Sequence, residues 1–454
     1  MHTTFQTHIV RAFLLASAAL LADLANAAPH FLPSQQGDLV PSKVSAPEVA
    51  LKSPGAPAMA REAVTMSWAA TDAVSTAVQP FIGQSREYYM EVSADDLHAG
   101  VAIHTTSPRA LVRMQPLNGG ETDSMAPRAQ LAIHPQSLVI VDAAGRAFDA
   151  GNGMDMLVTA DKLNKADMPF AEGTSAFRIH PDLGTGRFTL RAADIAGSAR
   201  YLVNVVEPAS PLVMALRTDA PTYLHGQTLT VQSELQEQIG ARIVDRHALK
   251  SMSGVVVSPG GRSFPVSFKV DKDGQLRARL PLDANEAPAP GLWEVQASGE
   301  AVVKGQTVKR SLRVAFGVAL PVARFDGNAA MVSEPGSVSL RIGVEVGAAG
   351  RYETRALLFG TVDGVLKPLA VAHAAQWLEA GSQSLVLRYD AALLNGATGP
   401  YELRDLTLLD QGRMGVLQRQ QRGIGIADSD VVRSGAHAAL AKPAERPKLP
   451  PQNG

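Results

Sequence analysis

One pattern occurs three times in this sequence: GRFTLRA at residues 186–192, GLWEVQA at 291–297 and GPYELRD at 399–405. Each copy begins with a glycine, has an aromatic residue third, and then alternates polar and aliphatic residues. Alternation with a period of two is typical of a β-strand with one buried and one solvated face. The aromatic residues Phe188, Trp293 and Tyr401 are separated by 105 and 108 residues, about the length of one β-sandwich domain. The repeat therefore predicts three tandem β-sandwiches.

A second alternating strand precedes each copy: AFRIHP at 176–181, QLRARLP at 275–281 and SLVLRYD at 384–390. In each of these strands the apolar residues share one face and an arginine lies on the other: Arg178, Arg277 and Arg388. Short strands separated by Gly-, Pro- and Asp-rich turns are typical of sandwiches. We predict an all-β protein with three tandem immunoglobulin-like β-sandwich domains after a signal peptide and a Pro-rich linker.

Domain boundaries follow from the repeat and from two proline-bearing joints. We predict a first domain with insertions at 61–208, a second domain at 209–320 and a third at 321–427. Two stretches of the first domain fall outside the repeat. We expect a helix in residues 61–79, and a long loop or short helical insert in residues 160–173.

Both ends of the chain differ in composition from these domains. Residues 1–27 have a weakly positive start, an apolar stretch and the small-x-small pattern Ala25-Asn26-Ala27, which is typical of a signal peptide cleaved after Ala27. Residues 28–60 contain six prolines and are predicted to be a linker. Residues 428–454 end in KPAERPKLPPQNG, and we predict a disordered tail.

Composition excludes several classes of function. The 454 residues include 42 Lys and Arg against 43 Asp and Glu, so no strong field attracts nucleic acid, and we expect no nucleic-acid partner. No stretch approaches the ~20 apolar residues of a membrane span. The chain has no cysteine, which excludes thiol chemistry and leaves stability to core burial. We expect an exported monomer, periplasmic or extracellular.

Motifs of common enzymes are absent from the sequence. It contains no H-E-x-x-H, no G-x-S-x-G and no G-x-x-x-x-G-K-[ST]. The first domain does contain four widely spaced histidines, which fall where solvated side chains are usual: His98, His104, His134 and His180. We predict no catalytic residues and no enzyme activity.

A glycine-rich stretch, DAAGRAFDAGNGMDM at 142–156, is a weak calcium candidate. Its oxygen-bearing side chains are Asp142, Asp149, Asn152 and Asp155. Calcium takes six to eight oxygen ligands from short loops, but these positions do not match the EF-hand spacing. The alternative is an ordinary loop in which Asp, Asn and Gly supply turn geometry, and we favour it. We therefore expect no cofactor, with calcium in this loop as the alternative.

The aromatic residues have two interpretations. Trp293 shares its strand phase with Val295 and Ala297, which predicts a core residue, and the equivalent aromatics of the other copies are expected to be structural anchors too. Tyr88 and Tyr89 are neighbours on a predicted strand, so one ring must point inward and one outward. The outward ring is a candidate for binding a sugar.

Three carboxylates lie in GPYELRDLTLLDQ at 399–411: Glu402, Asp405 and Asp410. They are either a catalytic cluster or the wet face of a strand. The repeat places Glu402 at a polar position of the pattern, which favours the wet face. Apolar residues change from odd numbers at Leu403 to even numbers at Leu406, which predicts a β-bulge at Arg404-Asp405.

Three further stretches carry a resemblance to a known family: VSADDLHAGVAIHTTSPRALVRMQPL at 92–117, GRYETRALLFGTVDGVLKPLAVAHAAQWLEAGSQSLVLRYDAALL at 350–394 and GPYELRDLTLLDQGRMGVL at 399–417. They resemble the first and last modules of domain of unknown function 4785, a family of exported proteins of Gram-negative bacteria. The resemblance implies tandem immunoglobulin-like modules and, for some members, type II secretion; it implies no catalytic residues. Residues 220–231, APTYLHGQTLTV, are similar to the opening strands of bacterial immunoglobulin-like and macroglobulin-like domains.

These observations favour an exported, non-enzymatic binding, adhesive or spacer protein with an unidentified protein or glycan partner. Open sheet edges and loops are the expected contact surfaces. The alternative is a secreted hydrolase-like or carbohydrate-binding protein with its site in the first domain and two accessory modules.

Overall fold

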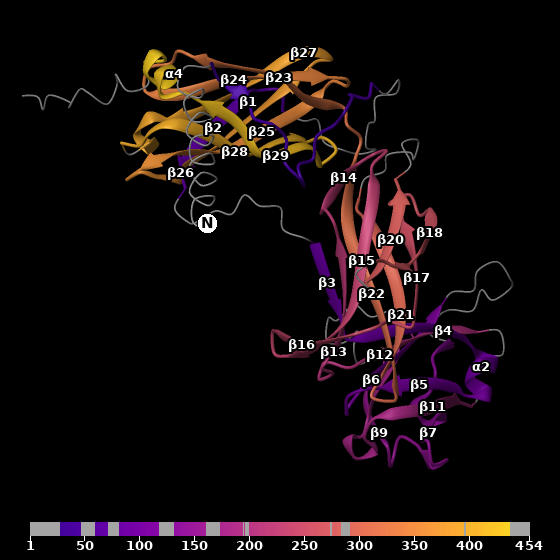
Figure 1. Ribbon diagram of the computed structural model, residues 1–454. Helices are drawn as coiled ribbons and strands as arrows, with labels where there is room; N and C mark the ends of the chain where they lie inside the picture. Colours follow the sequence, from indigo (N-terminus) through magenta and orange to yellow (C-terminus); the bar gives the residue numbers. More distant parts are fainter. Residues whose placement is uncertain are drawn as a thin grey trace, which may run out of the picture.

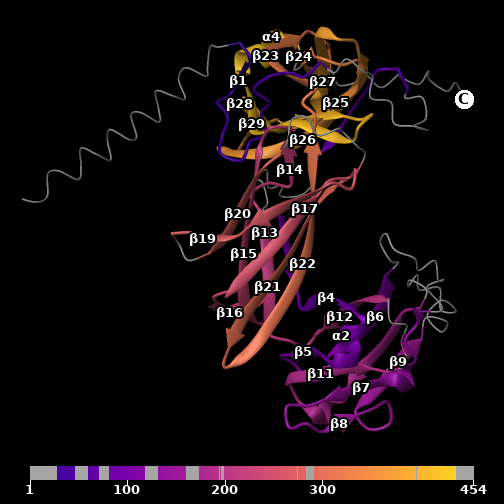
Figure 2. The ribbon, with the colours of Figure 1, turned by 90° about the vertical axis from the view of Figure 1, so that its right-hand side faces the viewer.

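The computed structural model shows three β-sandwich modules in succession, with the second in the middle (Figures 1 and 2). The structure describes residues 28–46, 60–70, 81–117, 131–159, 173–193, 195, 199–272, 275–282, 291–394 and 396–435. Regular structure in these residues is almost entirely β-strand, and the buried apolar side chains form three clusters, one centred in each module. The prediction of an all-β, multi-domain fold is confirmed.

The first module packs a five-stranded sheet against a four-stranded sheet. The five-stranded sheet has the order β4 (Glu87–Ser93), β12 (Arg200–Val206), β6 (Leu111–Leu117), β10 (Ser175–Ile179) and β9 (Met154–Thr159). The four-stranded sheet has the order β5 (Val101–Thr105), β11 (Gly186–Ala192), β7 (Leu138–Val141) and β8 (Ala147–Phe148). The first module also contains the short helix α2 (Ala94–Ala99) and the helical turns η2 (Pro135–Ser137) and η3 (Pro181–Leu183).

The second module also has two sheets. One has the order β19 (Lys269–Val270), β20 (Leu276–Pro281), β15 (Thr228–Ile239), β13 (Leu212–Thr218) and β3 (Phe81–Ser85), with β16 (Arg242–His247) paired to β15. The other has the order β14 (Thr222–Leu224), β22 (Gln306–Ala319), β21 (Trp293–Val303), β17 (Ser251–Val257) and β18 (Ser263–Ser267).

The third module has a six-stranded and a three-stranded sheet. The six-stranded sheet has the order β1 (His30–Phe31), β29 (Gly415–Ile426), β28 (Thr398–Asp410), β25 (Gly350–Val362), β26 (Val365–Leu378) and β2 (Val64–Ala69). The three-stranded sheet has the order β23 (Ala323–Val332), β24 (Ser337–Val346) and β27 (Gly381–Asp390). The turn η4 (Ala391–Leu394) and helix α4 (Asp428–Arg433) complete this module.

The repeated sequence pattern forms one strand in each module, namely β11, β21 and β28. The aromatic side chains of all three copies, Phe188, Trp293 and Tyr401, are buried. The Trp293 ring stacks on Phe264 with 5.7 Å between ring centroids, and the Tyr401 hydroxyl donates to the carbonyl of Ala397 at 2.7 Å. These residues are the structural anchors that the sequence predicted.

The predicted bulge lies at Asp405, which has a φ of +50°. Pairing of β28 with β25 shifts between Arg404 and Thr407, where Asp405 and Leu406 lie opposite the single residue Ala356. Pairing of β28 with β29 shifts one step earlier, between Leu403 and Arg404, where the additional residue is Gly423 of β29. Two residues opposite one on the neighbouring strand is the arrangement of a β-bulge. The bulge prediction is confirmed.

The N-terminal segment supplies edge strands to two modules before the chain enters the first. β1 pairs with β29 on one edge of the six-stranded sheet of the third module, and β2 pairs with β26 on the opposite edge. β3 then pairs with β13 on an edge of the second module. Because β4 follows in the first module, the modules are connected twice, once by this segment and once by the joints between domains (Figure 1).

The structure corrects the prediction that residues 28–60 are a linker. Its described part packs against the third module: the Phe31 ring lies 5.8 Å from that of Phe325, measured between centroids. The amide of Ser45 donates to the carbonyl of Pro321 at 2.8 Å. Prolines suppress strand pairing inside a sheet, but they are tolerated beside a sheet edge, and this is where the segment runs.

The expected helix in residues 61–79 is also wrong for the part that the structure describes, because residues 64–69 form strand β2. Apolar Val64, Met66 and Trp68 alternate with small residues at a period of two, which is a strand signal. The strand that they pair with, β26, lies far later in the sequence. Residues 71–79 lie outside the described residues.

The predicted disordered tail begins too early. Residues 428–433 form helix α4, and the fully buried Val431 belongs to the core of the third module. Asp428 Oδ1 accepts the amide N–H of Gly399 at 2.8 Å. The remainder of the tail, the signal peptide and most of the 160–173 insert lie outside the described residues. Within the described ranges, no helix has the length and apolarity needed to cross a membrane.

A buried ion pair joins the first and second modules. Glu207, in the joint between them, has its Oε2 2.7 Å from Nη1 of Arg310 on β22, and both side chains are fully buried. Arg310 Nη2 also donates to the hydroxyls of Thr106 and Ser210, each at 2.9 Å. Because these hydrogen bonds link a loop of the first module, the joint and a strand of the second, the junction is fixed in one geometry.

Candidate functional site

The candidate site is a cleft of about 510 Å³ where the second and third modules meet. Its walls come from three separate parts of the chain: residues 37–39 of the N-terminal segment, residues 219–223 and 227–228 of the second module, and four side chains of the third module, Arg355, Thr407, Val416 and Arg419. No single module forms it, so its shape depends on how the modules are held together.

The wall from the second module is organised by Asp219 and Tyr223. The Tyr223 hydroxyl donates to Asp219 Oδ1 at 2.5 Å and accepts the amide N–H of Ala220 at 3.1 Å. Burial of the ring raises the pKa of Tyr223, so its hydroxyl keeps its proton. Asp219 Oδ1 also accepts the amide N–H of Thr230 at 3.2 Å. These hydrogen bonds make this wall rigid, and the Asp219 carboxylate already accepts hydrogen bonds from the protein.

The wall from the N-terminal segment is tied to strand β29. Leu39 and Arg419 exchange backbone hydrogen bonds at 2.9 and 2.8 Å. The Asp38 carboxylate accepts the amide of Gln421 at 2.8 Å on one oxygen and the amide of Gln35 at 2.8 Å on the other. Like Asp219, this carboxylate already accepts hydrogen bonds from the protein, here from two backbone amides.

The cationic groups of the cleft differ in their surroundings. Arg419 Nε donates to Asp405 Oδ1 at 2.5 Å, so the bulge residue holds this guanidinium in place. Arg355 is exposed on β25, and among the described residues no hydrogen-bond or ion-pair partner is found for its side chain. Arg355 is therefore the charged group of the cleft that is available to a ligand.

The two tyrosines singled out from the sequence face opposite ways, as expected. Tyr88 is buried, and its hydroxyl donates to the carbonyl of His104 at 3.1 Å, so it belongs to the core. The half-buried Tyr89 is the outward ring; its hydroxyl donates to Glu87 Oε1 at 2.6 Å. The guanidinium of Arg313, from the second module, lies 5.7 Å from the Tyr89 ring centroid. Tyr89 thus lies beside the junction of the first two modules.

The weak calcium candidates serve local turns. Asp142 accepts the amides of Ala144 and Arg146, both at 2.9 Å, and forms an ion pair with the Arg146 side chain. Asp149 Oδ1 accepts the amide of Gly151 at 2.8 Å, and Asn152 Oδ1 accepts that of Asp149 at 2.8 Å. The fourth candidate, Asp155, is exposed on β9. These hydrogen bonds are those of turns, although calcium binding itself stays a prediction that no observation tests.

The four histidines of the first module also have separate surroundings. His98 and His134 are exposed. The His180 side chain caps η3, and its Nδ1 lies 3.4 Å from Asp182 Oδ2. The half-buried His104 has its pKa lowered by burial and by the nearby charges of Lys309 and Arg187.

Glu402 and Asp410 differ from the wet-face prediction, because both are buried. Glu402 is only 7% exposed, and its carboxylate accepts hydrogen bonds from Arg422 at 2.6 and 2.9 Å and from Arg404 at 3.0 Å. Asp410 accepts the amide of Arg413 at 3.1 Å and pairs with its guanidinium. Glu402 lies on the polar side that the strand phase predicted, but the long side chains of Arg404 from its own strand and Arg422 from β29 cover it.

Two family models match this chain. The N-terminal domain of a domain of unknown function (DUF4785) matches residues 55–207, and the C-terminal domain of the same family matches residues 323–427. The two matches together cover more than half of the sequence. The chain belongs to the DUF4785 family.

A solved DUF4785 structure has the same fold. The crystal structure of a DUF4785 family protein from Legionella pneumophila subsp. pneumophila str. Philadelphia 1 is 21% identical and has a TM-score of 0.66. The similarity covers 87% of this chain and 99% of that one. The resemblance found in the sequence is thereby confirmed, and the likeness at this identity concerns the fold alone.

Two further matches are more distant. The native conformation of Escherichia coli alpha-2-macroglobulin matches 76% of this chain and 20% of that chain, with 11% identity and a TM-score of 0.26, which is too low to support an inference. The electron transfer flavoprotein subunit alpha of Chromohalobacter salexigens is 22% identical over 265 residues. These residues are 55% of this chain, and the match spans 57% of that relative's length.

Proposed function

We propose that this DUF4785 protein is an exported, non-enzymatic binding protein that holds an acidic segment of a protein partner in the cleft between its second and third modules. The modules act as a fixed frame, and the cleft is the recognition site. The residue that carries recognition is Arg355.

The observation that carries the proposal is the double connection of the modules. Residues 37–39 form one wall of the cleft, and they are held on β29 by the Leu39–Arg419 backbone pair. The same N-terminal segment continues to β2 on the third module and β3 on the second. A frame connected in this way keeps the cleft preformed, which lowers the entropic cost of binding.

The chemistry of the cleft favours an anionic ligand over a neutral sugar. Arg355 lacks an ion-pair partner among the described residues, whereas both aspartates of the cleft accept hydrogen bonds from protein groups. A guanidinium can donate two parallel hydrogen bonds to one carboxylate. The aromatic residue of the cleft, Tyr223, is buried and offers no exposed ring on which a sugar could stack.

The proposal also changes the expected mode of contact. Both edges of the six-stranded sheet in the third module are occupied by β1 and β2. A partner strand that paired directly with β29 or β26 would have to displace these strands. Recognition in a cleft needs no such rearrangement.

The cleft is tested by affinity capture from periplasmic extract and culture medium, with quantitative mass spectrometry. The baits are the wild-type protein, Arg355→Ala and, as a control, Arg341→Ala, which removes an exposed arginine of the same module on β24. We expect a partner that both the wild type and Arg341→Ala retain and that Arg355→Ala retains about tenfold more weakly, since a hydrogen bond to a charged group contributes about 1.5–3 kcal/mol. Equal retention by all three baits would refute the cleft as the binding site.

Export and the absence of catalysis are tested separately. Fractionated cells should contain the protein in the periplasm or medium with Ala28 as its first residue. A cytoplasmic protein that retains Met1 would refute export. Purified protein with flavin absorbance would instead support a role like the one that the name of the Chromohalobacter relative describes.

A further inference from the structure

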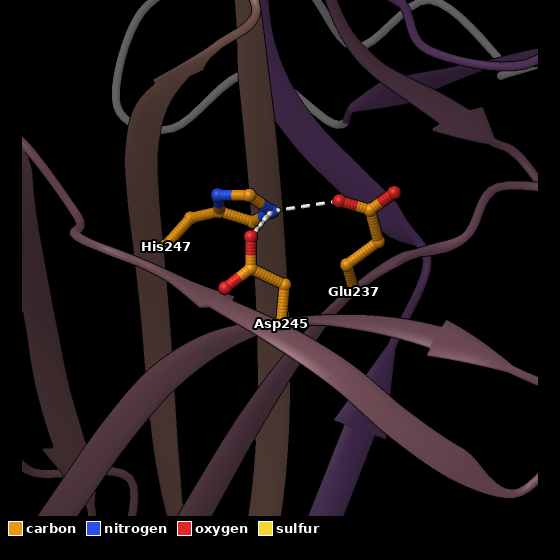
Figure 3. A group of neighbouring side chains, drawn as sticks. All are labelled: Glu237, Asp245 and His247. Atoms are coloured by element: carbon orange, nitrogen blue, oxygen red, sulfur yellow. Dashed lines mark hydrogen bonds and ion pairs between the residues drawn. The ribbon is translucent and has the colours of Figure 1, made fainter.

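A second group of ligand-type side chains lies far from the cleft, at the end of the second module that adjoins the first. Glu237 on β15 and Asp245 and His247 on β16 each place one ligand atom within 4.8 Å of the others. Figure 3 shows the three side chains converging on the same face of the hairpin. Residues Glu237 and Asp245 are directly opposite each other in the register, and His247 follows two residues later on the same face.

The separations between these atoms are close to those that a tetrahedral metal requires. His247 Nε2 lies 3.0 Å from Glu237 Oε2 and 4.0 Å from Asp245 Oδ2. Around Zn²⁺, with bonds of about 2.0–2.2 Å to nitrogen and oxygen, neighbouring tetrahedral ligands lie roughly 3.3 Å apart. These two separations lie on either side of this value, and the two carboxylate oxygens lie within 4.8 Å of each other, so side-chain rotations can bring all three atoms to tetrahedral spacing.

Neighbouring groups already orient both carboxylates. Asp245 Oδ1 accepts the amide N–H of Arg246 at 2.8 Å, which leaves Oδ2 directed at the imidazole. Glu237 Oε1 accepts from Lys304 Nζ at 3.2 Å, which leaves Oε2 directed at the same nitrogen. Each carboxylate is thus held by one oxygen while the other faces His247, an arrangement that positions metal ligands.

We propose that Glu237, Asp245 and His247 form a zinc site with water as the fourth ligand. A nitrogen ligand beside two carboxylate oxygens suits a borderline ion such as Zn²⁺ better than Ca²⁺ or Mg²⁺, which prefer oxygen alone. The Glu237 and His247 side chains are mostly buried, so little side-chain freedom is lost on binding. Lys304, at the tip of the β21–β22 hairpin, donates to Glu237 Oε1, whereas the metal would bind Oε2. The Lys304 side chain is 76% exposed and is free to move away when the metal binds.

Isothermal titration of Zn²⁺ into the tag-free, chelator-washed full chain tests this site. We expect one Zn²⁺ per wild-type chain, and affinity at least about tenfold weaker in His247→Ala. The control is His373→Ala. His373 is also paired with a carboxylate, that of Glu353 at 2.9 Å, and its removal should leave zinc binding unchanged. Identical titrations of the wild type and His247→Ala would overturn the proposal, because the group would then be an ion pair only.

Two further measurements keep the result independent of folding. Glu237→Gln preserves the size of the side chain and should also lose the site, with an unfolding midpoint in metal-free buffer close to that of the wild type. Cobalt should give the wild type a visible spectrum of a tetrahedral centre with a nitrogen ligand. A wild-type spectrum that stays identical to that of His247→Ala would again overturn the site.

Discussion

Nη1 of Arg310 lies 2.7 Å from Oε2 of Glu207, and solvent reaches neither side chain. Glu207 belongs to the joint after the first module, whereas Arg310 lies on the final strand of the second. Burial lowers the pKa of Arg310, an effect that the Glu207 charge opposes. Loss of either partner would leave a buried charge without its counter-charge, so the pair makes the junction of the two modules specific.

Replacing Glu207 with glutamine should destabilise the protein strongly, because it leaves the Arg310 charge buried without a counter-charge. The expected loss is about 3–5 kcal/mol in the free energy of unfolding, measured by urea denaturation. The matched control is Glu345→Gln, whose ion pair with Arg324 has the same 2.7 Å separation but is partly exposed to solvent. That control should cost no more than about 1 kcal/mol, and equal losses in the two variants would contradict the assigned role of burial.

The double variant Glu207→Gln, Arg310→Met separates the charge from the packing. Removing both charges should recover much of the stability lost in Glu207→Gln, since no unpaired charge is then buried. A double variant that is less stable than the single one would show that the hydrogen bonds of Arg310 to Thr106 and Ser210 dominate.

Stability of the third module should depend on pH through Glu402. Burial opposes ionisation of this carboxyl, but hydrogen bonds and charges of Arg422 and Arg404 outweigh it and lower its pKa from the ordinary 4.5. A lowered pKa gives stability that is present above the unfolded value and lost as pH falls through the folded value. The stability difference between wild type and Glu402→Gln should therefore be full at pH 7 and shrink below about pH 4.5.

Urea denaturation at a series of pH values measures that difference. The control, Glu91→Gln, removes one half of an exposed pair with Arg200, and should show little change with pH. A Glu402→Gln difference that stays constant from neutral to acidic pH would rule out the role given to the carboxylate.

Asp405 offers a test of backbone geometry at the bulge. Its φ of +50° is a conformation that Asn tolerates and a β-branched residue does not. Asp405→Asn and Asp405→Val both remove the charge that holds Arg419, so the difference between them reports the backbone together with the hydrogen bond that the Asn oxygen can still accept. Asp405→Val should be less stable than Asp405→Asn by about 1–2 kcal/mol in thermal unfolding. Equal stabilities would mean that the bulge relaxes in both variants.

Local patterns were sufficient to predict the repeated strands and the bulge. Trp293 and Tyr401 are buried where the period of two placed them, and the phase change after Leu403 coincides with the shift in pairing. These features depend on residues that are neighbours in sequence, and periodicity describes such residues well.

Features that depend on distant residues could not be predicted in this way. Val64 and Met66 alternate as a strand does, but their partner is β26, and no local signal identifies it. Glu402 is covered by arginines from its own strand and from β29, so its burial is a property of the assembled sheet. The cleft likewise combines three distant segments.

The metal-ligand group was missed for a related reason. Glu237, Asp245 and His247 lie within one hairpin, and the D-x-H spacing of Asp245 and His247 was a signal available in the sequence. Strand periodicity places the last two on one face. The position of Glu237 on the same face depends on a register shift beside it, which the sequence alone does not show.

The bracing of the modules by the N-terminal segment is tested most directly by a disulfide placed across β2 and β26. The chain has no cysteine, so Met66→Cys with His373→Cys introduces a single possible pair. These two residues are register partners, and opposite residues of antiparallel strands have the Cα separation that a disulfide requires. The control pairs Met66→Cys with Lys367→Cys, six residues along β26 and about 20 Å away.

The measurement is mass spectrometry of the linked peptides after mild oxidation of the monomer. Bracing predicts an intramolecular disulfide between the two introduced cysteines of the β2–β26 pair in nearly every chain, and almost none in the control. Equal linking in the two proteins, or links only between separate chains, would contradict it.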